Sequence, residues 1–237
     1  GYTIVLTSIS HATAAGFFQK LPYNLLSDLQ AVCLIATQPN TLVVHPSLPV
    51  RSLKDFIALS RARPGQLTFS SSGNGTVQHL MGELLMSLAR IDMVHVPYKG
   101  TAPALTELIS GQVSVGFQPV INAVPNAKAG RLRMLAVTGP KRSVAALDVP
   151  TLMEAGLPQY NVVAWYGVHA PARAPKAVVD ALNREMNRAL AAPEISDRLS
   201  SQGLEPAGYT PEQFGAFVKS EVARWSKLIR ESGIKPE

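Results

Sequence analysis

Segments typical of strands and segments typical of helices alternate along almost the whole chain, and this alternation constrains the fold more than any other feature. Short apolar runs predict strands at 2–7, 31–37, 41–44, 93–96, 113–117, 132–137 and 162–168, with another that begins at Leu67. Amphipathic segments predict helices at 52–63, from 75 or 76 onward, and at 102–110, 175–191 and 211–231. The pattern favours an α/β fold with largely parallel sheets, in one large or two small domains.

Two of the predicted helices carry sequence signals at their first turn. Ser52 is followed three residues later by Asp55, and Thr210 is followed by Gln213, which is the spacing of a capping box. Gly233 comes just after the last predicted helix, where glycine is common. These signals indicate where the two helices start and where the second one ends.

One strand-to-helix connection has the composition of an anion-binding loop. The strand that begins at Leu67 leads into a polar turn, and an amphipathic helix follows. Free N–H groups and the helix dipole at such an N-terminus favour a carboxylate or phosphate, and glycines let the main chain approach it. The alternative is an ordinary turn that ends in an N-cap. The candidate residues are Ser70, Ser71, Ser72, Gly73, Asn74, Gly75, Thr76 and, one turn into the helix, His79, which would reach an anion or cap local hydroxyls.

Known nucleotide and hydrolase motifs do not match this loop. Gln78 stands where a dinucleotide fingerprint needs its third glycine, and the chain has no Gly-Lys-Ser/Thr sequence of a P-loop. The Gly-x-Ser-x-Gly sequence of a nucleophile elbow is also missing. We therefore expect no cofactor, and a serine hydrolase built from Ser and His side chains stays an alternative without a motif to support it.

Polar residues also follow three other predicted strands. At the carboxyl ends of strands in open α/β sheets, such residues line ligand sites. Gathered at one edge, they would form a small cleft of mostly neutral hydrogen-bond donors, which suits recognition better than catalysis. The alternative for each is an exposed turn residue. The candidates are Ser8, Ser10 and His11 after the first strand, Tyr98 and Lys99 after 93–96, and Gln118 after 113–117.

Composition argues against several other classes of function. The net charge of +6 comes from Lys and Arg scattered along the chain, with only 6% aromatic residues, so nucleic-acid binding has little support. The histidines show neither His-x-x-x-His nor His-Glu-x-x-His spacing, so we expect no metal site. Cys33 is the single cysteine, which excludes an intramolecular disulfide. No apolar run reaches the length of a membrane helix.

Several short motifs, in order, give the chain a resemblance to a known family. It closely resembles, over essentially its whole length, the Bug-type periplasmic solute receptors of tripartite tricarboxylate transporters. The motifs are Gly1-Tyr2-Thr3 followed by Ser8 and His11, then Leu21-Pro22-Tyr23, the loop 70–75 with His79, Val96-Pro97-Tyr98-Lys99-Gly100, Lys128-Ala129-Gly130-Arg131-Leu132-Arg133, and Trp165-Tyr166-Gly167.

The resemblance implies a two-lobed periplasmic binding protein fold, type II-like, that closes over a small organic carboxylate by a hinge motion. It implies one lobe from 1–39 and 163–237 and another from 40–162. It also implies a receptor without catalytic activity, a monomer, that works in the periplasm and delivers its ligand to the permease subunits in the membrane. In such receptors ordered water largely holds one ligand carboxylate between two strand-to-helix loops, one of which matches 70–76. Trp165 joins the expected ligand-binding residues.

Two features depart from the family. Its other ligand loop belongs to a first strand-loop-helix unit that this sequence lacks, so we expect a truncated N-terminal lobe whose sheet exposes an edge. The sequence also begins at Gly1 without a signal peptide. Gln118 stands where the family commonly carries Asp, so we expect ligands with an ammonium group to be accepted less well. The alternative from another class is a ligand-sensing effector domain of a transcription regulator, which shares this fold.

Overall fold

A computed structural model describes residues 3–18 and 20–232 of the chain. Tyr2 of the first predicted strand and Gly233 lie outside the described residues. The chain divides into two compact units. Unit 1 combines Gly1–Gln38 with Ala164–Glu237, and unit 2 is Pro39–Val163. Within the described part of the chain, no helix has an apolar stretch long enough to cross a bilayer.

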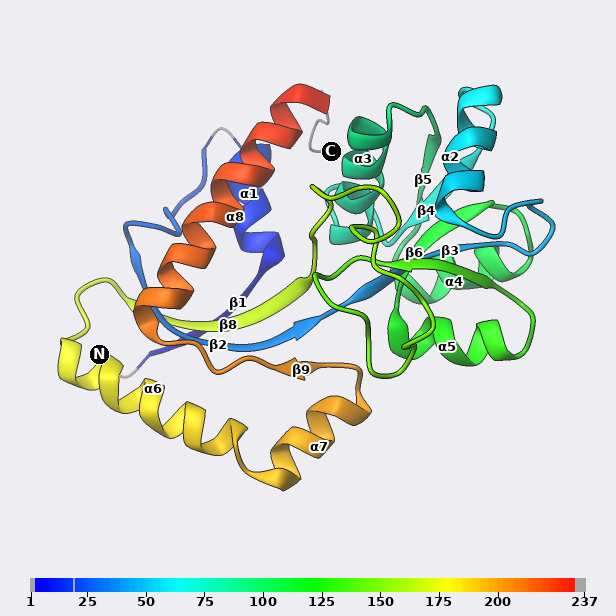
Figure 1. Cartoon of the computed structure of the whole chain (residues 1–237). Helices are drawn as coiled ribbons and strands as arrows, with labels where there is room; N and C mark the ends of the chain where they lie inside the picture. Colours follow the sequence, from blue (N-terminus) through cyan, green and yellow to red (C-terminus); the bar gives the residue numbers. More distant parts are fainter. Residues whose placement is uncertain (1–2, 19, 233–237) are drawn as a thin grey trace. The chain divides into compact units, whose positions relative to one another are not determined.

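Unit 1 is built on a four-stranded sheet in the order β1-β8-β2-β9, and every pair of neighbours in it is antiparallel. Helices α1 and α8 pack side by side, α8 also packs against β2, and α6 packs against β2 as well (Figure 1). The strands are β1 (Val5–Ser8), β2 (Leu29–Gln38), β8 (Ala164–Pro171) and β9 (Glu205–Pro206), and the helices are α1 (Ile9–Phe17), α6 (Lys176–Leu190), α7 (Pro193–Ser201) and α8 (Pro211–Ser232).

Strand β8 is covered on both faces, which explains its apolar sequence. Trp165 and His169 lie against Phe214 of α8, whereas Val168 and Ala170 belong to the cluster that α6 completes. Successive side chains of a strand point to opposite faces, so the two sets alternate. At the sheet's edge, β1 pairs only with β8 among the described residues, and its Leu6 side chain is 62% exposed.

Unit 2 contains a five-stranded sheet in the order β5-β4-β6-β3-β7. Helix α3 packs on β4 and β6, and α4 packs on the same two strands (Figure 1). Because Phe69 lies against Gly82 of α3 and Gly116 lies against Leu108 of α4, the two helices cover opposite faces. The strands are β3 (Asn40–Val44), β4 (Thr68–Ser71), β5 (Val94–Pro97), β6 (Val115–Pro119) and β7 (Arg133–Val137), and the helices are α2 (Leu53–Ala62), α3 (Val77–Ala89), α4 (Thr101–Ile109) and α5 (Val120–Lys128).

The prediction of largely parallel sheets is wrong. In unit 2, β4 runs parallel to β5 and β6, but β3 is antiparallel to β6 and β7, and unit 1 has no parallel pair among its described strands. Alternating strands and helices give a parallel sheet only when each helix returns the chain to the same edge. Here β2 and β8 are the strands by which the chain leaves and re-enters unit 1, so they run in opposite directions.

Both predicted capping signals are confirmed. The Asp55 N–H donates to Ser52 Oγ at 3.1 Å, and Thr210 and Gln213 exchange reciprocal hydrogen bonds of 3.0 and 3.2 Å. Helices α1, α5 and α7 were not predicted. Their patterns are weak: α1 is apolar on most sides, α5 contains Pro125, and α7 has no buried residue to mark an apolar face.

Candidate functional site

Most of the predicted site residues of unit 2 gather at one edge of its sheet, which is the edge formed by the ends of the strands and not an outer strand. The parallel strands β4, β5 and β6 all end at this edge, and the antiparallel strand β3 begins there. Ser70 and Ser71 are the last residues of β4, Gln118 is the next to last residue of β6, and Tyr98 and Lys99 directly follow β5. The strand directions therefore bring together residues that are up to 48 positions apart in sequence.

The Ser/Gly loop, residues 72–76, joins β4 to α3 at this edge. Gly73 and Gly75 have φ angles of +135° and +71°, which side chains disfavour, so the loop needs glycine at both positions. Thr76 Oγ1 donates to the Gly73 carbonyl at 2.7 Å, and Ser72 Oγ donates to Gln78 Oε1 at 2.8 Å. Internal hydrogen bonds thus fold the loop over the start of α3.

Helix α3 presents its N-terminus at the loop. It has 13 residues and no acidic side chain in its first turn. The first N–H groups of a helix have no intrahelical acceptor, and the helix dipole adds partial positive charge there. This end of the helix therefore fits an anionic group such as a carboxylate.

Buried polar atoms beside the loop lack partners. Among the described residues, Ser70 Oγ, Thr41 Oγ1 and Gln118 Oε1 are buried and have no hydrogen-bond partner. Thr41 lies opposite Gln118, and Ser70 lies opposite Gly116, so the register places all three side chains on one face of neighbouring strands. An unsatisfied buried polar group costs about 1–3 kcal/mol. Groups of this kind are retained where they serve a ligand or ordered water.

Thr41 was not among the predicted site residues. It is fully buried in β3, and its sequence signal is a polar residue at the start of the apolar run 41–44. Because β3 is antiparallel to β6, the beginning of one strand meets the end of the other. The prediction of a parallel sheet missed Thr41, because in a parallel sheet only residues at the carboxyl ends of strands meet at this edge.

Two histidines, His79 and His95, are connected to the Ser/Gly loop by hydrogen bonds. His79 Nδ1 accepts the N–H of Gly75 at 3.1 Å, and His79 Nε2 lies 3.4 Å from Glu83 Oε1. His95 Nε2 lies 2.6 Å from Ser71 Oγ, and burial, followed by the neighbouring His79, lowers the pKa of His95 to about 4. Both imidazoles therefore have protein partners.

The Ser71–His95 contact has the distance of a nucleophile and its base, but it does not support a hydrolase. Ser71 is 1% exposed, and its hydroxyl also donates to the Gly73 carbonyl at 3.0 Å and accepts the Gly73 N–H at 3.1 Å. A nucleophile must reach a substrate. Ser71 instead ties the loop to the sheet.

Tyr98 and Lys99 extend the edge beyond β5. The Tyr98 N–H donates to the Ser71 carbonyl at 3.0 Å, which fixes the turn beside the Ser/Gly loop. Burial and, to a lesser extent, the charge of Glu107 raise the pKa of the Tyr98 phenol, so it stays a neutral donor. Lys99 is exposed. These two residues add a phenol and an ammonium group at the same edge.

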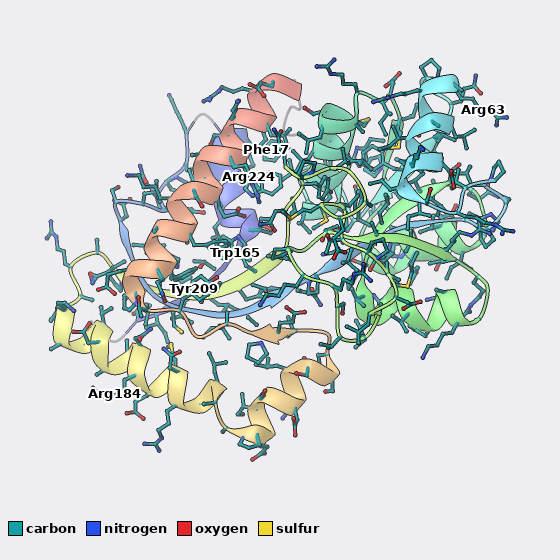
Figure 2. The ribbon with its side chains drawn as sticks, viewed as in Figure 1. Phe17, Arg63, Trp165, Arg184, Tyr209 and Arg224 are labelled. Atoms are coloured by element: carbon teal, nitrogen blue, oxygen red, sulfur yellow. The ribbon has the colours of Figure 1, made fainter. Side chains whose placement is uncertain are left out.

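The candidates of unit 1 lie in two separate places. Ser8 is the N-cap of α1, and its N–H donates to His11 Nδ1 at 3.1 Å; Ser10 is an exposed residue of the first turn. Trp165, by contrast, is fully buried between β8 and α8, where Figure 2 shows it near Arg224. Its indole N–H donates to Glu221 Oε2 at 3.1 Å. Trp165 thus packs in the core of unit 1, and its contact with a ligand stays a prediction.

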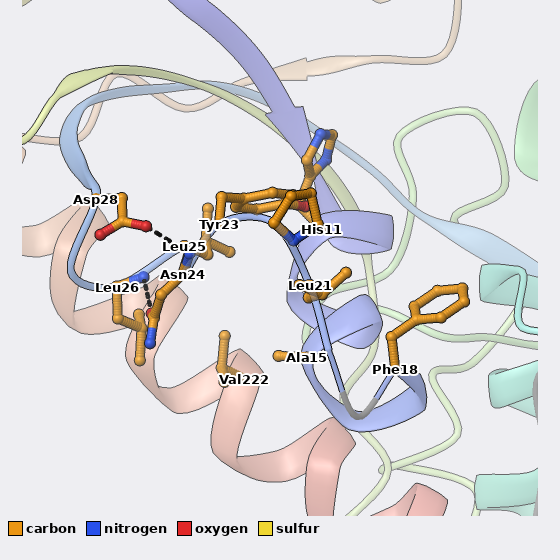
Figure 3. A pocket seen from close by; sticks show the side chains of 11 residues that line it. His11, Ala15, Phe18, Leu21, Tyr23, Asn24, Leu25, Leu26, Asp28 and Val222 are labelled. Atoms are coloured by element: carbon orange, nitrogen blue, oxygen red, sulfur yellow. Dashed lines mark hydrogen bonds between the residues drawn. The ribbon is translucent and has the colours of Figure 1, made fainter.

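A pocket of about 460 Å³ lies in unit 1 between α1, the segment 21–28 and α8, and His11 of the predicted set lines it (Figure 3). Asp28 in its wall accepts the Asn24 N–H at 2.8 Å and the Ser27 hydroxyl at 3.0 Å, and these bonds lower the pKa of Asp28. Its polar groups thus stabilise their own turn, and much of the remaining lining is apolar. The described residues also contain no group of three or more side chains that could hold a metal ion.

Comparison with known proteins gives a match over nearly the whole chain. The family model described as "Tripartite tricarboxylate transporter family receptor" matches residues 1–234. The chain is 35% identical to Protein BugT of Bordetella pertussis over 239 residues, which covers 99% of this chain and 73% of BugT.

Two solved structures with bound ligands are also similar. The first is Rpa4515 of Rhodopseudomonas palustris with adipate, with a TM-score of 0.84, 35% identity, and coverage of 100% of this chain and 80% of that one. The second is MatC (Rpa3494) of the same species with bound malate, with a TM-score of 0.79, 31% identity, and coverage of 96% and 79%. Both of those proteins hold a dicarboxylate.

Proposed function

The chain belongs to the receptor family of tripartite tricarboxylate transporters, and from this premise we propose that it captures a small organic carboxylate and delivers it to the transporter's membrane permease. Members of this family are periplasmic solute receptors, so the serine hydrolase alternative is wrong. Similar receptors hold adipate and malate, which supports a dicarboxylate as the ligand class. We place the protein in the periplasm by the same argument.

One observation carries the proposed ligand class: the N-terminus of α3 and three unpartnered buried polar side chains lie at the same sheet edge. The helix N-terminus suits a carboxylate, and Ser70 and Thr41 offer hydroxyl donors that lack partners. The unpartnered atom of Gln118 is its amide oxygen Oε1, an acceptor for ordered water or for a donor group of the ligand. Neutral donors bind a carboxylate without a full counter-charge, as backbone N–H groups do. Ordered water between them and the ligand would extend their reach.

We further propose that units 1 and 2 are the two lobes of the receptor. The loop 70–76, Tyr98, Lys99 and Gln118 are its ligand-binding residues in unit 2, with Thr41 added. Ser8, Ser10 and His11 stay the candidates from unit 1.

Gln118 bears on the choice between simple carboxylates and amino acids. It is 1% exposed, and its side chain is a neutral amide. A ligand ammonium group buried beside it would lack a counter-charge, which is unfavourable. We therefore expect succinate to bind better than aspartate, and Gln118→Asp to shift the affinity ratio toward aspartate. Calorimetry with both ligands on both proteins measures that ratio; an unchanged ratio would show that Gln118 does not select the ligand.

The experiment for the loop compares two glycines with the same backbone conformation. Gly75 has φ +71° in the Ser/Gly loop, and Gly130 has φ +69° in a turn with open space around it. Alanine costs about 1–2 kcal/mol of backbone strain at either position. We expect Gly75→Ala to weaken adipate binding at least tenfold and Gly130→Ala to leave it unchanged, as measured by calorimetry. Both variants should lose a similar free energy of unfolding, so that a difference in affinity does not come from a difference in stability. Stabilisation of the protein by sugars or amines alone, in a thermal-shift screen, would contradict the proposed function.

A further inference from the structure

His79 and His95, the two histidines connected to the Ser/Gly loop, form a stacked pair. The ring centroids of His79 on α3 and His95 on β5 lie 3.7 Å apart, and the ring planes differ by 11°. Phe69 of β4 stacks on His95 with a centroid distance of 4.8 Å. Packing against Phe69 and against each other fixes the positions of both imidazoles.

Each imidazole is connected by hydrogen bonds to one glycine of the Ser/Gly loop. His79 Nδ1 accepts the Gly75 N–H directly. His95 reaches Gly73 through one hydroxyl, since Ser71 Oγ lies 2.6 Å from His95 Nε2 and bonds both the N–H and the carbonyl of Gly73. The two glycines with positive φ are therefore the two residues that the histidine pair holds.

The hydrogen bonds also assign the tautomer of His79. Its Nδ1 must be unprotonated to accept the Gly75 N–H, so the ring proton is on Nε2, which faces Glu83 Oε1 at 3.4 Å. With Nδ1 directed at Gly75 and Nε2 at Glu83, both ring nitrogens have protein partners. The Gly75 N–H is likewise committed to His79 and is not a donor for a ligand.

We propose that His79 and His95 are positioning residues that hold Gly75 and Gly73 in the conformation in which the Ser/Gly loop receives a carboxylate, without touching the ligand themselves. The inference rests on the proposed function for the identity of the ligand. Its physical reason is preorganisation: a loop held in the bound conformation loses less conformational entropy when the ligand arrives. The donors left to the ligand are the first N–H groups of α3 and the unpartnered hydroxyl of Ser70.

The test uses two replacements of His79 that differ in one acceptor. In His79→Asn the amide oxygen takes approximately the place of Nδ1, whereas His79→Leu has no acceptor. His45→Leu is the control. His45 Nδ1 also bonds its own turn, at 2.7 Å from Ser47 Oγ, but His45 follows β3 at the opposite edge of the sheet. Circular dichroism checks that each variant is folded.

The first measurement is amide hydrogen exchange without ligand. We expect the Gly75 amide to exchange at least tenfold faster in His79→Leu than in the natural protein and in His79→Asn, with no change in His45→Leu. Equal exchange of Gly75 in all four proteins would overturn the inference, whatever the ligand results are. This readout does not depend on the proposed function.

The second measurement is adipate affinity by calorimetry at pH 7.5. We expect His79→Leu to bind at least tenfold more weakly than the natural protein and His79→Asn to stay within about threefold of it. Equal losses in the Asn and Leu variants would identify His79 as a ligand contact and overturn the positioning role. If the natural protein binds no carboxylate, the proposed function fails, and the exchange data alone decide whether His79 holds the loop.

Discussion

The buried polar groups of the two units differ in how they are satisfied. In the core of unit 1, Glu221 accepts the indole N–H groups of Trp165 and Trp225 at 3.1 and 3.0 Å, and Arg224 lies 2.6 Å from its second oxygen. At the sheet edge of unit 2, Ser70, Thr41 and Gln118 keep buried atoms without partners among the described residues. The polar groups of the two sites are buried to a similar extent, but those around Glu221 are hydrogen-bonded and those at the sheet edge of unit 2 have atoms without partners.

This difference separates stability from binding. A carboxylate that receives two indole N–H bonds and an arginine stabilises the fold as long as every partner is present. Hydroxyl and amide groups without partners reduce stability, and they are useful only if something else binds them. We infer that the interior of unit 1 serves the fold, whereas the sheet edge of unit 2 gives up some stability for ligand binding.

The largest expected effect is the loss of Glu221. Glu221→Ala leaves two buried indole N–H groups unpaired, and we expect the free energy of unfolding of unit 1 to fall by about 3 kcal/mol. Both tryptophans of the chain lie in unit 1, so tryptophan fluorescence during urea unfolding reports this unit.

The control for this variant is Glu185→Ala on the same unit. Glu185 is 57% exposed and forms surface ion pairs, which contribute about 0–1 kcal/mol. A loss in Glu221→Ala no larger than in Glu185→Ala would mean that the buried network is not what stabilises unit 1, and the comparison would fail.

The second prediction concerns pH and His169, which is 2% exposed in β8. Burial, and then the nearby His11, lower the pKa of His169 to about 4 from a normal value near 6.5. The folded protein thus binds this proton less well than the unfolded chain. Stability is full above pH 6.5 and falls as the pH approaches 4, by about 2 kcal/mol at pH 5.

His169→Leu isolates this contribution, because it removes the titrating ring and keeps an apolar side chain. We expect its unfolding free energy, followed by tryptophan fluorescence, to depend less on pH between 6.5 and 4 than that of the natural protein. Parallel pH profiles of the two proteins would show that His169 does not supply the difference.

The smallest expected effects come from a matched pair of threonines. Thr7 and Thr41 are both fully buried in strands, but the Thr7 hydroxyl donates to the Gly167 carbonyl at 3.1 Å and contacts His169 Nδ1 at 2.8 Å, whereas Thr41 Oγ1 has no partner. We expect Thr7→Val to lower the unfolding free energy by about 1 kcal/mol and Thr41→Val to raise it by a similar amount.

Thermal unfolding followed by circular dichroism measures both threonine variants, and adipate calorimetry gives the second readout. Thr41→Val should bind adipate more weakly although it is more stable, while Thr7→Val should bind it unchanged. If Thr41→Val destabilises the protein as much as Thr7→Val does, the hydroxyl of Thr41 has a structural partner and the distinction between the units disappears.

Local sequence signals predicted the parts of the site that are local in the chain. The polar turn before an amphipathic helix places 70–76 at the N-terminus of α3, and the two glycines there have the positive φ angles that justify them. The bond from the Gly75 N–H to His79 spans four residues and was within reach of the same reasoning.

Residues that depend on strand register escaped prediction. Thr41 joins Gln118 only because β3 and β6 are antiparallel, and His95 joins His79 only because β5 lies next to β4. The partner of the Trp165 indole N–H was likewise hidden in the sequence, because it is Glu221, 56 residues later. A sequence pattern reports the periodicity of one segment and not the partner that another segment supplies.

Gly116 restricts how this site can evolve. A side chain at this position would come within 2.9 Å of Leu108 and 3.0 Å of Ser70 Oγ, so one substitution would disturb the core and the polar edge together. Changes of ligand preference by single mutations are therefore more accessible at Thr41 and Gln118, whose polar atoms are unpartnered. A library that varies these two positions while keeping Gly116 should yield more folded receptors with altered specificity than one that varies all three.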